Sequence, residues 1–326
     1  MSVFFFYTLE NCIIIVYNNN KDENKGDIIM KHYSSVIIGH ITMDRNVDHL
    51  GNEIGSPGGA VIFSSASANA LGHNVLALTK VAKKDWDRLE AFTVPKENLL
   101  CLDCESSSNM YNQYFTPDKE RRKCVCTSIG TPFVASDIPD DITADIFHFA
   151  GLVYGDFPNE LIKETSKRGK IAVDVQACLR HVDVNDGGTM HFEDWADKKE
   201  MLPYIDFLKT DAAEAEILTG LEDRYEAAKV LHSWGAKEVV ITHNTEVIAY
   251  DGEKFCSCPI KARNLSGRTG RGDTTFAAYI NERLTHDMEH SLLYATATVS
   301  LKMETPGPFR GTREDVEKYI EEFYKQ

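Results

Sequence analysis

From Met30 onward, short runs of β-branched and other apolar residues alternate with longer segments in which apolar residues recur at helical spacing. This alternation is typical of parallel strands, because the crossover between two parallel strands is usually a helix. The sequence therefore predicts an α/β fold, with a mostly parallel sheet between two layers of helices. The expected strands are Ser35–Gly39, Leu76–Val81, Ile146–Gly151, Lys170–Val175, Phe207–Thr210 and Glu238–Thr242.

Two regions, about residues 45–56 and 109–127, have the composition of strands but no helices between them. The second contains MYNQYF, a turn at TPDKER and then KCVC, which is the pattern of a β-hairpin. Extra strands of this kind are expected to pack as a small separate sheet, and such a sheet can close over a ligand as a lid. An ordinary surface hairpin is the alternative. If the hairpin Asn109–Cys126 pairs with a second copy of the chain, a homodimer follows.

The first 29 residues differ from the rest of the chain. Their apolar stretch has no basic flank ahead of it and is interrupted by Glu10 and Asn11, which argues against a signal peptide or a membrane span. The polar run NNNKDENKGD that follows is typical of a flexible linker. We expect residues 1–29 to be an appendage and residues 30–326 to form the functional domain.

The net charge and the cysteine content indicate which partners and which cellular compartment to expect. With 35 Lys and Arg against 50 Asp and Glu, the net charge is −15, so nucleic acid and membrane surfaces are not expected partners. Eight cysteines without a secretory signal favour reduced thiols in the cytoplasm. The pairs Cys101–Cys104 and Cys124–Cys126 offer an alternative, a four-thiolate zinc site, although the second spacing is tighter than usual.

The densest local signal is the glycine-rich run from Asn264 to Leu284, NLSGRTGRGDTTFAAYINERL. Gly267, Gly270 and Gly272 precede a predicted helix that begins near Asp273. Glycines allow a close approach to a ligand, and a helix start offers unpaired N–H groups, so together they predict a phosphate site. The spacing is not G-x-G-x-x-G, which disfavours a nucleotide-dependent dehydrogenase.

Asp273 decides what chemistry this phosphate site can perform. It stands where a P-loop has lysine, and a carboxylate there is suited to accept a proton from a hydroxyl group that attacks a phosphate. The alternative is that Asp273 only caps the helix.

The run GRTGRGDT resembles the C-terminal signature of the ribokinase-like, or PfkB, carbohydrate kinases, whose usual form is DTxGAGD. The resemblance implies that Gly270, Arg271 and Gly272 form an anion hole and that Asp273 is the general base. It also implies a kinase that uses ATP and Mg²⁺ to phosphorylate a small polyol, that is a sugar, a cyclitol or a nucleoside.

Other segments resemble the family in the same order along the chain from Met30. The opening strand IIGHITMD and the first signature SPGGAVIFSSASANALG imply substrate contacts. The run LKTDAAEAEILTG implies residues near the Mg²⁺–phosphate site, with Glu214 acting on the metal indirectly, and VVITHNTEV implies a nucleotide-contacting turn. The implied substrate residues are Asp44, Gly58, Gly59 and Phe63, and the implied cofactor residues are Asp211, Glu214, Thr242, Asn244 and Thr269.

Simpler interpretations stand beside these assignments. Asp44 can be a solvent-facing strand end, and Gly58 and Gly59 a turn before a helix Ala60–Leu71. Asp211 and Glu214 have the spacing of a capping box, which needs no metal.

The sequence departs from the family pattern at several positions. Gly267 stands where the family usually has Asp, which puts potassium activation in question. Arg271 replaces a small residue in the anion hole, Phe63 replaces a polar Asn that touches the sugar, and Asn244 replaces a glycine. These changes, with DVQACLR at Asp174–Arg180, resemble the divergent inositol-kinase-like branch. They also leave a rival open: a non-catalytic nucleotide- or sugar-binding regulatory protein.

Overall fold

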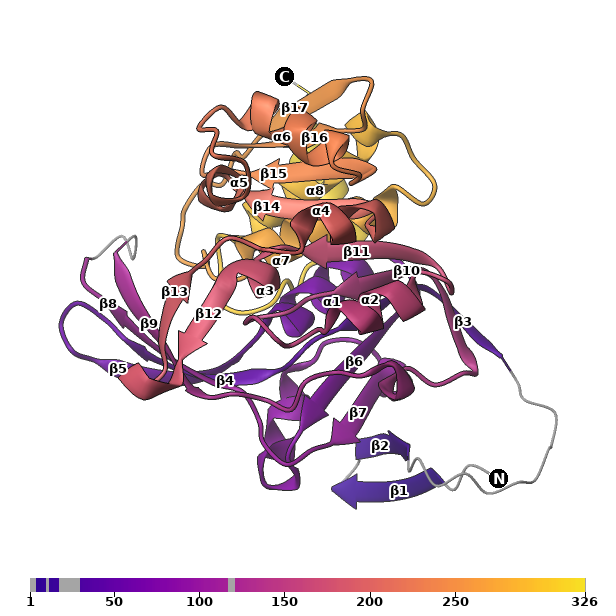
Figure 1. Cartoon of the computed structure of the whole chain (residues 1–326), viewed down its shortest axis with the longest axis vertical. Helices are drawn as coiled ribbons and strands as arrows, with labels where there is room; N and C mark the ends of the chain where they lie inside the picture. Colours follow the sequence, from indigo (N-terminus) through magenta and orange to yellow (C-terminus); the bar gives the residue numbers. More distant parts are fainter. Residues whose placement is uncertain (1–3, 10–11, 18–29, 117–120, 326) are drawn as a thin grey trace.

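The computed structural model describes residues 4–9, 12–17, 30–116 and 121–325. Its centre is a sheet of eleven strands between two layers of helices (Figure 1), which confirms the predicted α/β class. In spatial order the strands are β1 Phe4–Leu9, β2 Cys12–Tyr17, β7 Leu99–Asp103, β6 Val75–Val81, β3 Lys31–Ile38, β10 Ile142–Phe149, β11 Lys170–Asp174, β14 Phe207–Asp211, β15 Glu238–Thr242, β16 Glu246–Tyr250 and β17 Phe255–Pro259.

The seven strands from β7 to β15 are all parallel, and all six predicted strands are among them. Their apolar runs are continuous because both faces of the sheet are covered, so every residue of β6 and of β15 is buried. β16 and β17 extend the sheet antiparallel to β15.

At the other edge, β1 and β2 form an antiparallel hairpin, and β2 lies beside β7. Residues 18–29, which include the predicted linker, lie outside the described residues. That the functional domain begins at Met30 stays a prediction.

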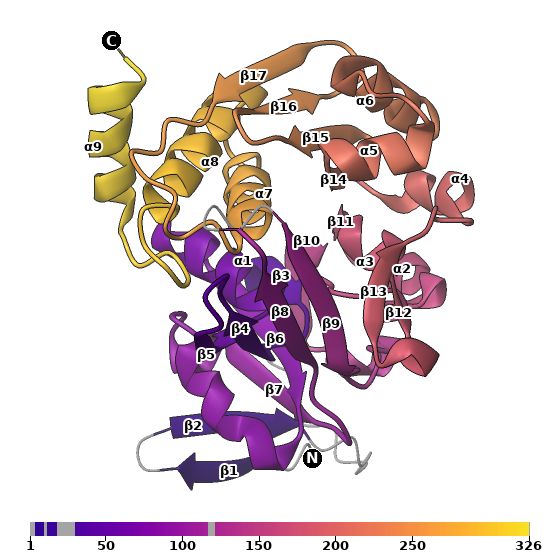
Figure 2. The same ribbon diagram turned by 90° about the vertical axis from the view of Figure 1, so that its left-hand side faces the viewer.

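Helices cover both faces of the sheet, with α1, α7, α8 and α9 on one side and α2, α4, α5 and α6 on the other (Figure 2). Each layer buries an apolar cluster against the sheet, which is where most of the folding free energy of such a domain arises. The helices are α1 Ala60–Ala70, α2 Asn159–Thr165, α3 Gln176–Leu179, α4 Lys198–Met201, α5 Ala212–Thr219, α6 Arg224–Ser233, α7 Arg271–Glu282, α8 Met288–Lys302 and α9 Arg313–Phe323.

A second sheet of six strands stands apart from the large one (Figure 1). It contains both of the regions that the sequence predicts as extra strands, together with β12 and β13, which the sequence analysis missed. In spatial order its strands are β12 Arg180–Asp183, β13 Thr189–Phe192, β9 Arg122–Ser128, β8 Asn109–Tyr114, β4 Thr42–Val47 and β5 Glu53–Gly58.

The strands of the second sheet come in pairs along the chain: β4 and β5 follow β3, β8 and β9 follow β7, and β12 and β13 follow β11. They therefore begin at the edge of the parallel sheet where α/β proteins bind ligands. Within this sheet β8 lies between β9 and β4, and β9 also pairs with β13 through one residue pair. β8 is therefore paired along both edges, whereas the outer edge of β9 is paired at Val125 only.

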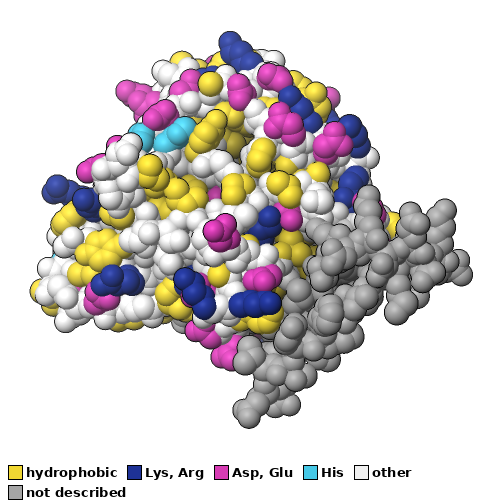
Figure 3. Space-filling model, turned by 60° about the horizontal axis from the view of Figure 1, so that its bottom comes forward, with side chains coloured by type: hydrophobic (Ala, Val, Ile, Leu, Met, Phe, Trp, Pro, Cys, Tyr) yellow, Lys and Arg dark blue, Asp and Glu magenta, His cyan; other side chains and the backbone are white. Residues whose placement is uncertain are grey.

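The cysteine pairs do not form a metal cluster in the part of the chain that the structure describes. Cys101 is a buried residue of β7, whereas Cys124 and Cys126 lie in β9 of the other sheet. None of the helices in the described ranges is long and apolar enough to cross a membrane. On the face shown in Figure 3, the described acidic and basic side chains are interspersed with apolar ones.

Candidate active site

A buried charge cluster lies at the carboxyl ends of two neighbouring strands. Asp174 ends β11, and Lys209 is its register partner in β14. The Lys209 Nζ contacts the two carboxylate oxygens of Asp174 at 3.1 and 2.9 Å and lies 3.9 Å from the Glu214 carboxylate. The sequence analysis did not single out Asp174 or Lys209 as site residues. Their positions at the ends of buried strands were the available signal, because such ends meet at one edge of a parallel sheet.

Burial and neighbouring charges together set the charge state of this cluster. Burial alone would lower the pKa of Lys209, but the carboxylates of Asp174 and Glu214 outweigh it, so the pKa is raised and the ammonium persists. Burial raises the pKa of Glu214 to about 7, against the opposing effect of Lys209. One buried cation therefore faces two carboxyl groups, of which that of Glu214 is partly protonated at neutral pH.

The glycine-rich run forms the start of α7, beside this cluster. Gly270 is the N-cap residue of α7, with the left-handed angles φ 77° and ψ 14°, which a residue with a Cβ rarely adopts. Asp273 is the third residue of the helix and not its cap, so the capping alternative for Asp273 is wrong. A helix start leaves its first N–H groups without helical partners, as an anion site requires.

Lys209 lies directly next to this helix start. A Cβ atom on Gly272 would stand 3.0 Å from the Lys209 Nζ. Because glycine has no Cβ, the Lys209 ammonium reaches the helix start. An anion bound there would contact both this ammonium and the backbone amides.

Asp273 is partly buried, and its surroundings change the pKa of its carboxyl group. Burial, and after it the nearby carboxylate of Asp174, raise the pKa of Asp273 to about 6, while Lys209 and Arg180 oppose the rise. A carboxylate with a pKa just below neutrality is ionised at neutral pH and still basic enough to accept a proton.

Two residues of helix α1 contact the glycine-rich loop and the first turn of α7. The ring of Phe63 lies against Gly270, where an added Cβ would meet the ring at 2.2 Å. The Ser64 hydroxyl donates to the backbone carbonyl of Asp273 at 3.3 Å. The structure thus places the buried Phe63 against the glycine-rich loop, and a contact between Phe63 and a substrate stays a prediction.

Asp44 lies at the amino end of the same helix α1. The Thr42 hydroxyl donates to its carboxylate at 2.5 Å, and Gly58 packs directly against that carboxylate. Gly59 is the N-cap residue of α1. Ser64, which contacts the start of α7, is five residues further on, or about 7.5 Å along the helix axis. Asp44 from β4 and Asp273 from the first turn of α7 therefore both lie near the amino-terminal half of α1.

Arginines of the second sheet stand near both carboxylates. Burial raises the pKa of Asp44, against the opposing effects of the Thr42 hydrogen bond and of Arg122 in β9. Burial lowers the pKa of Arg180 in β12, and the charge of Arg122 adds to that effect. The sequence analysis did not assign a role to either arginine, since nothing local in β9 or β12 shows which way they face.

We predict that Gly58→Ala displaces the Asp44 carboxylate, because the new Cβ would stand 2.4 Å from its Oδ2 atom. A displacement of this order can cost about a hundredfold in kcat/KM for the acceptor. The matched control is Gly55→Ala in the same strand, where an added Cβ meets nothing within 4 Å. Equal kcat/KM values for the two variants would show that Asp44 does not position the acceptor.

The predicted cofactor residues divide into two groups. Asp211 and Glu214 form the capping box of α5: the Glu214 amide donates to Asp211, and the Asp211 amide donates to Glu214, each at 2.8 Å. The capping interpretation is therefore confirmed as local structure. A role in binding magnesium stays a prediction, although carboxylate oxygens are suitable ligands for it.

The second group joins the turn after β15 to the glycine-rich loop. Thr242 ends β15 and is buried. The guanidinium groups of Arg271 and Arg268 both donate to the Asn244 side-chain oxygen, at 2.8 and 3.4 Å. Thr269, an exposed loop residue, accepts a hydrogen bond at its carbonyl from Lys302. Two cationic side chains therefore lie where the sequence predicts a nucleotide contact.

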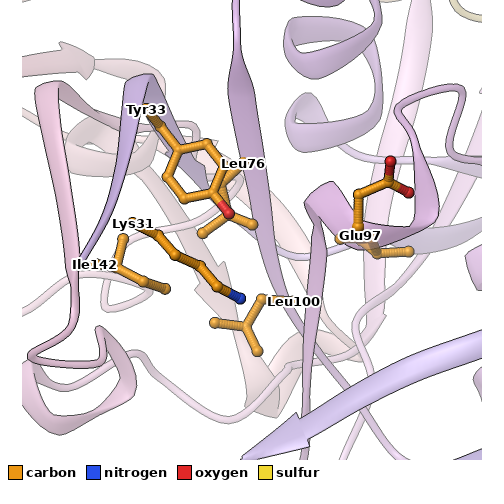
Figure 4. Close-up of a pocket in the computed structure, with 7 residues that line it drawn as sticks. Lys31, Tyr33, Leu76, Glu97, Leu100 and Ile142 are labelled. Atoms are coloured by element: carbon orange, nitrogen blue, oxygen red, sulfur yellow. The ribbon is translucent and has the colours of Figure 1, made fainter. Parts of the chain in front are cut away.

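Two hollows elsewhere lack the chemistry of this site. The first, with a volume of about 10 Å³, lies at the amino ends of the parallel strands, where Tyr33 and Leu76 contribute to its wall (Figure 4). It holds no more than a single water molecule. The second, of about 360 Å³, lies between β17 and α8. Neither is lined by a residue of the candidate site.

One group of potential metal ligands, Glu282, His286 and His290, lies at the other end of α7. Arg313 already contacts both carboxylate oxygens of Glu282, at 2.8 and 3.1 Å. The two imidazole rings stack 3.9 Å apart with 7° between their planes, so their in-plane lone pairs do not meet at one ion. The group is a set of partly exposed cationic and imidazole side chains around the buried Glu282 carboxylate.

Comparison with known proteins decides the family. The profile of the pfkB family carbohydrate kinases matches residues 135–314, more than half of the chain. This chain belongs to the pfkB family of carbohydrate kinases. The assignment confirms the kinase prediction and removes the dehydrogenase alternative.

Individual pfkB relatives differ in substrate and donor. The chain is 26% identical over 256 residues to a cytidine kinase of Thermococcus kodakarensis, covering 75% of this chain and 86% of that protein. It is 31% identical to a pyrophosphate-dependent kinase in the ribokinase family, solved with a pyrophosphate analog and myo-inositol, with a TM-score of 0.78 over 87% of this chain and 99% of that one. The ribokinase of Arabidopsis thaliana, solved with ribose and ATP, shares the fold at 18% identity and a TM-score of 0.69, over 89% and 99% of the two chains.

Proposed function

We propose that this pfkB-family kinase transfers a phosphoryl group from ATP to a hydroxyl group of a small polyol, with Asp273 as the general base. The observation that carries the proposal is the position of Asp273 in the first turn of α7, close to the buried Lys209. A site that only bound phosphate would gain nothing from a carboxylate at this position, because the two negative charges repel each other.

The proposed reaction is an in-line displacement. The acceptor hydroxyl lies between Asp44 and Asp273, gives its proton to Asp273, and attacks the terminal phosphorus of the donor. The amides of Gly270, Arg271 and Gly272 and the ammonium of Lys209 stabilise the charge that develops on the transferring group. Magnesium, held through Glu214 and Asp211, would neutralise the charge of the donor phosphates.

Two observations favour a cyclitol as the acceptor. The relative solved with myo-inositol shares more sequence with this chain than the cytidine kinase does. Phe63, which stands where the family usually has a sugar-binding Asn, lies buried under Gly270. We therefore place myo-inositol first among the acceptors to be tested.

A second candidate donor is pyrophosphate. Arg268 and Arg271 converge on Asn244, at the turn where a nucleotide is expected. Guanidinium groups bind phosphate oxygens well and offer nothing specific to a nucleoside. The 31%-identical relative is itself pyrophosphate-dependent.

A panel of two donors against several acceptors tests both proposals. ATP and pyrophosphate, each with Mg²⁺, are supplied to the purified protein with myo-inositol, ribose, fructose, cytidine or adenosine, and phosphorylated product is measured. We expect turnover with ATP and a polyol. Turnover with pyrophosphate alone would correct the donor, and ligand-dependent thermal stabilisation without product for any pair would support the non-catalytic binding protein instead.

Two further expectations belong to this proposal. The seven cysteines from Cys101 to Cys258 are all free, in keeping with a reducing cytoplasmic compartment. The small second sheet is proposed to act as the lid over the acceptor and as the contact of a homodimer, which chromatographic size would test.

A further inference from the structure

Lys302, the last residue of α8, is a buried lysine that faces the glycine-rich loop before α7. It is 1% exposed. Its ammonium donates to the carbonyl oxygen of Gly267 at 2.5 Å and also to that of Thr269. Burying an ammonium group is costly unless its donors find partners. Here two carbonyl groups of one loop provide them.

The same loop is tightly held on its other sides. The Gly267 amide donates to the Met303 carbonyl at 2.7 Å, and a Cβ on Gly267 would lie 1.9 Å from the Thr305 carbonyl oxygen. At the far end of the loop, Gly270 packs on the Phe63 ring, and the Lys302 Nζ lies 5.0 Å from the centre of that ring. Lys302 thus contacts the loop between its two anchored ends.

The planarity of the peptide group links these contacts to the anion hole. In a trans peptide the C=O and the following N–H point in opposite directions. When the Thr269 carbonyl turns toward Lys302, the Gly270 N–H must turn away from it, and the Gly267 carbonyl fixes the Arg268 N–H in the same manner. The ammonium therefore controls the direction of amides next to the start of α7.

We infer that Lys302 is a positioning residue, whose ammonium holds the loop 267–270 so that the amides at the start of α7 are ready to bind the transferring phosphoryl group. This inference rests on the proposed function. Burial lowers the pKa of Lys302 to about 8, and the charge of Asp273 opposes the shift, so most of the group is an ammonium at neutral pH.

Two variants of Lys302 test the inference. Lys302→Ala leaves a space lined by the two carbonyls, which an ammonium or potassium ion from solution can fill, whereas Lys302→Met fills the space with an apolar chain. We expect both to lose about a hundredfold in kcat, the cost of a small misplacement, with little change in KM for the acceptor. Ammonium chloride should restore the Ala variant but not the Met variant, and tetramethylammonium chloride neither. Lys229→Met, an exposed lysine, is the control.

Hydrogen exchange of the amides of residues 267–272 provides a readout without turnover. Faster exchange in the Met variant than in the wild type is expected even if no donor or acceptor is turned over, so failure of the kinase proposal would not decide this one. Unchanged kcat and unchanged exchange in both variants would overturn the inference. So would failure of both variants to fold, because Lys302 would then support the whole domain and not one loop.

Discussion

Replacing Asp273 by Asn should lower kcat by on the order of 10²–10⁴ while leaving donor and acceptor binding nearly intact, because the amide keeps the shape of the carboxylate but cannot accept the proton. The measurement is the steady-state rate of product formation with the donor and acceptor that the panel selects. Asp145→Asn, in an exposed part of β10, is the matched control. Equal turnover by wild type and Asp273→Asn would remove Asp273 from the chemistry.

The pH dependence of kcat/KM tests the role of Asp273 independently. The pKa of Asp273 is raised to about 6, so the carboxylate is protonated, and unable to act as a base, as the pH falls through that value. Wild-type kcat/KM should therefore decline below about pH 6 and level off above it. Asp273→Asn has no proton to lose at this position, and its residual activity should lack that acidic limb.

Replacing Lys209 by Met should destabilise the protein by about 3–5 kcal/mol, the usual cost of removing one partner of a buried ion pair. Lys209 is 5% exposed, and its removal leaves Asp174 and Glu214 as neighbouring buried carboxylates without their cation. The free energy of unfolding is measured by urea denaturation.

The control for this variant is Lys237→Met. Lys237 also pairs with an aspartate, Asp206, at 2.6 Å, but its side chain is 67% exposed. Exposed pairs contribute about 0–1 kcal/mol, so the two lysines should differ clearly. If Lys209→Met were as stable as Lys237→Met, the cluster would not carry the buried charge that its geometry implies.

How far the sequence predicts this molecule depends on whether a feature is local. The parallel strands were predictable because an unbroken apolar run such as β15 is what a strand buried on both faces requires. The short strands β12 and β13 were not, since they are half-exposed and carry no comparable run. Gly270 and Asp273 were found because the helix start that they form lies within one stretch of the chain.

The remaining site residues come together only through the order of the strands. Asp174 meets Lys209 because β11 and β14 are neighbours, and no pattern in either segment states that pairing. Lys302 reaches the glycine-rich loop from the end of a different helix. Local sequence therefore singled out Asp273, the proposed base, while its electrostatic surroundings required the assembled fold.

The second sheet joins strands that are far apart along the chain: β4 pairs with β8, and β9 with β13. Contacts between such distant segments form slowly, because long loops must close before any pairing rewards them. We expect the second sheet, the proposed surface for the acceptor, to be completed late in folding, after most helices and the central strands have formed. A newly made chain would then acquire its secondary structure before it acquires a place to hold its substrate.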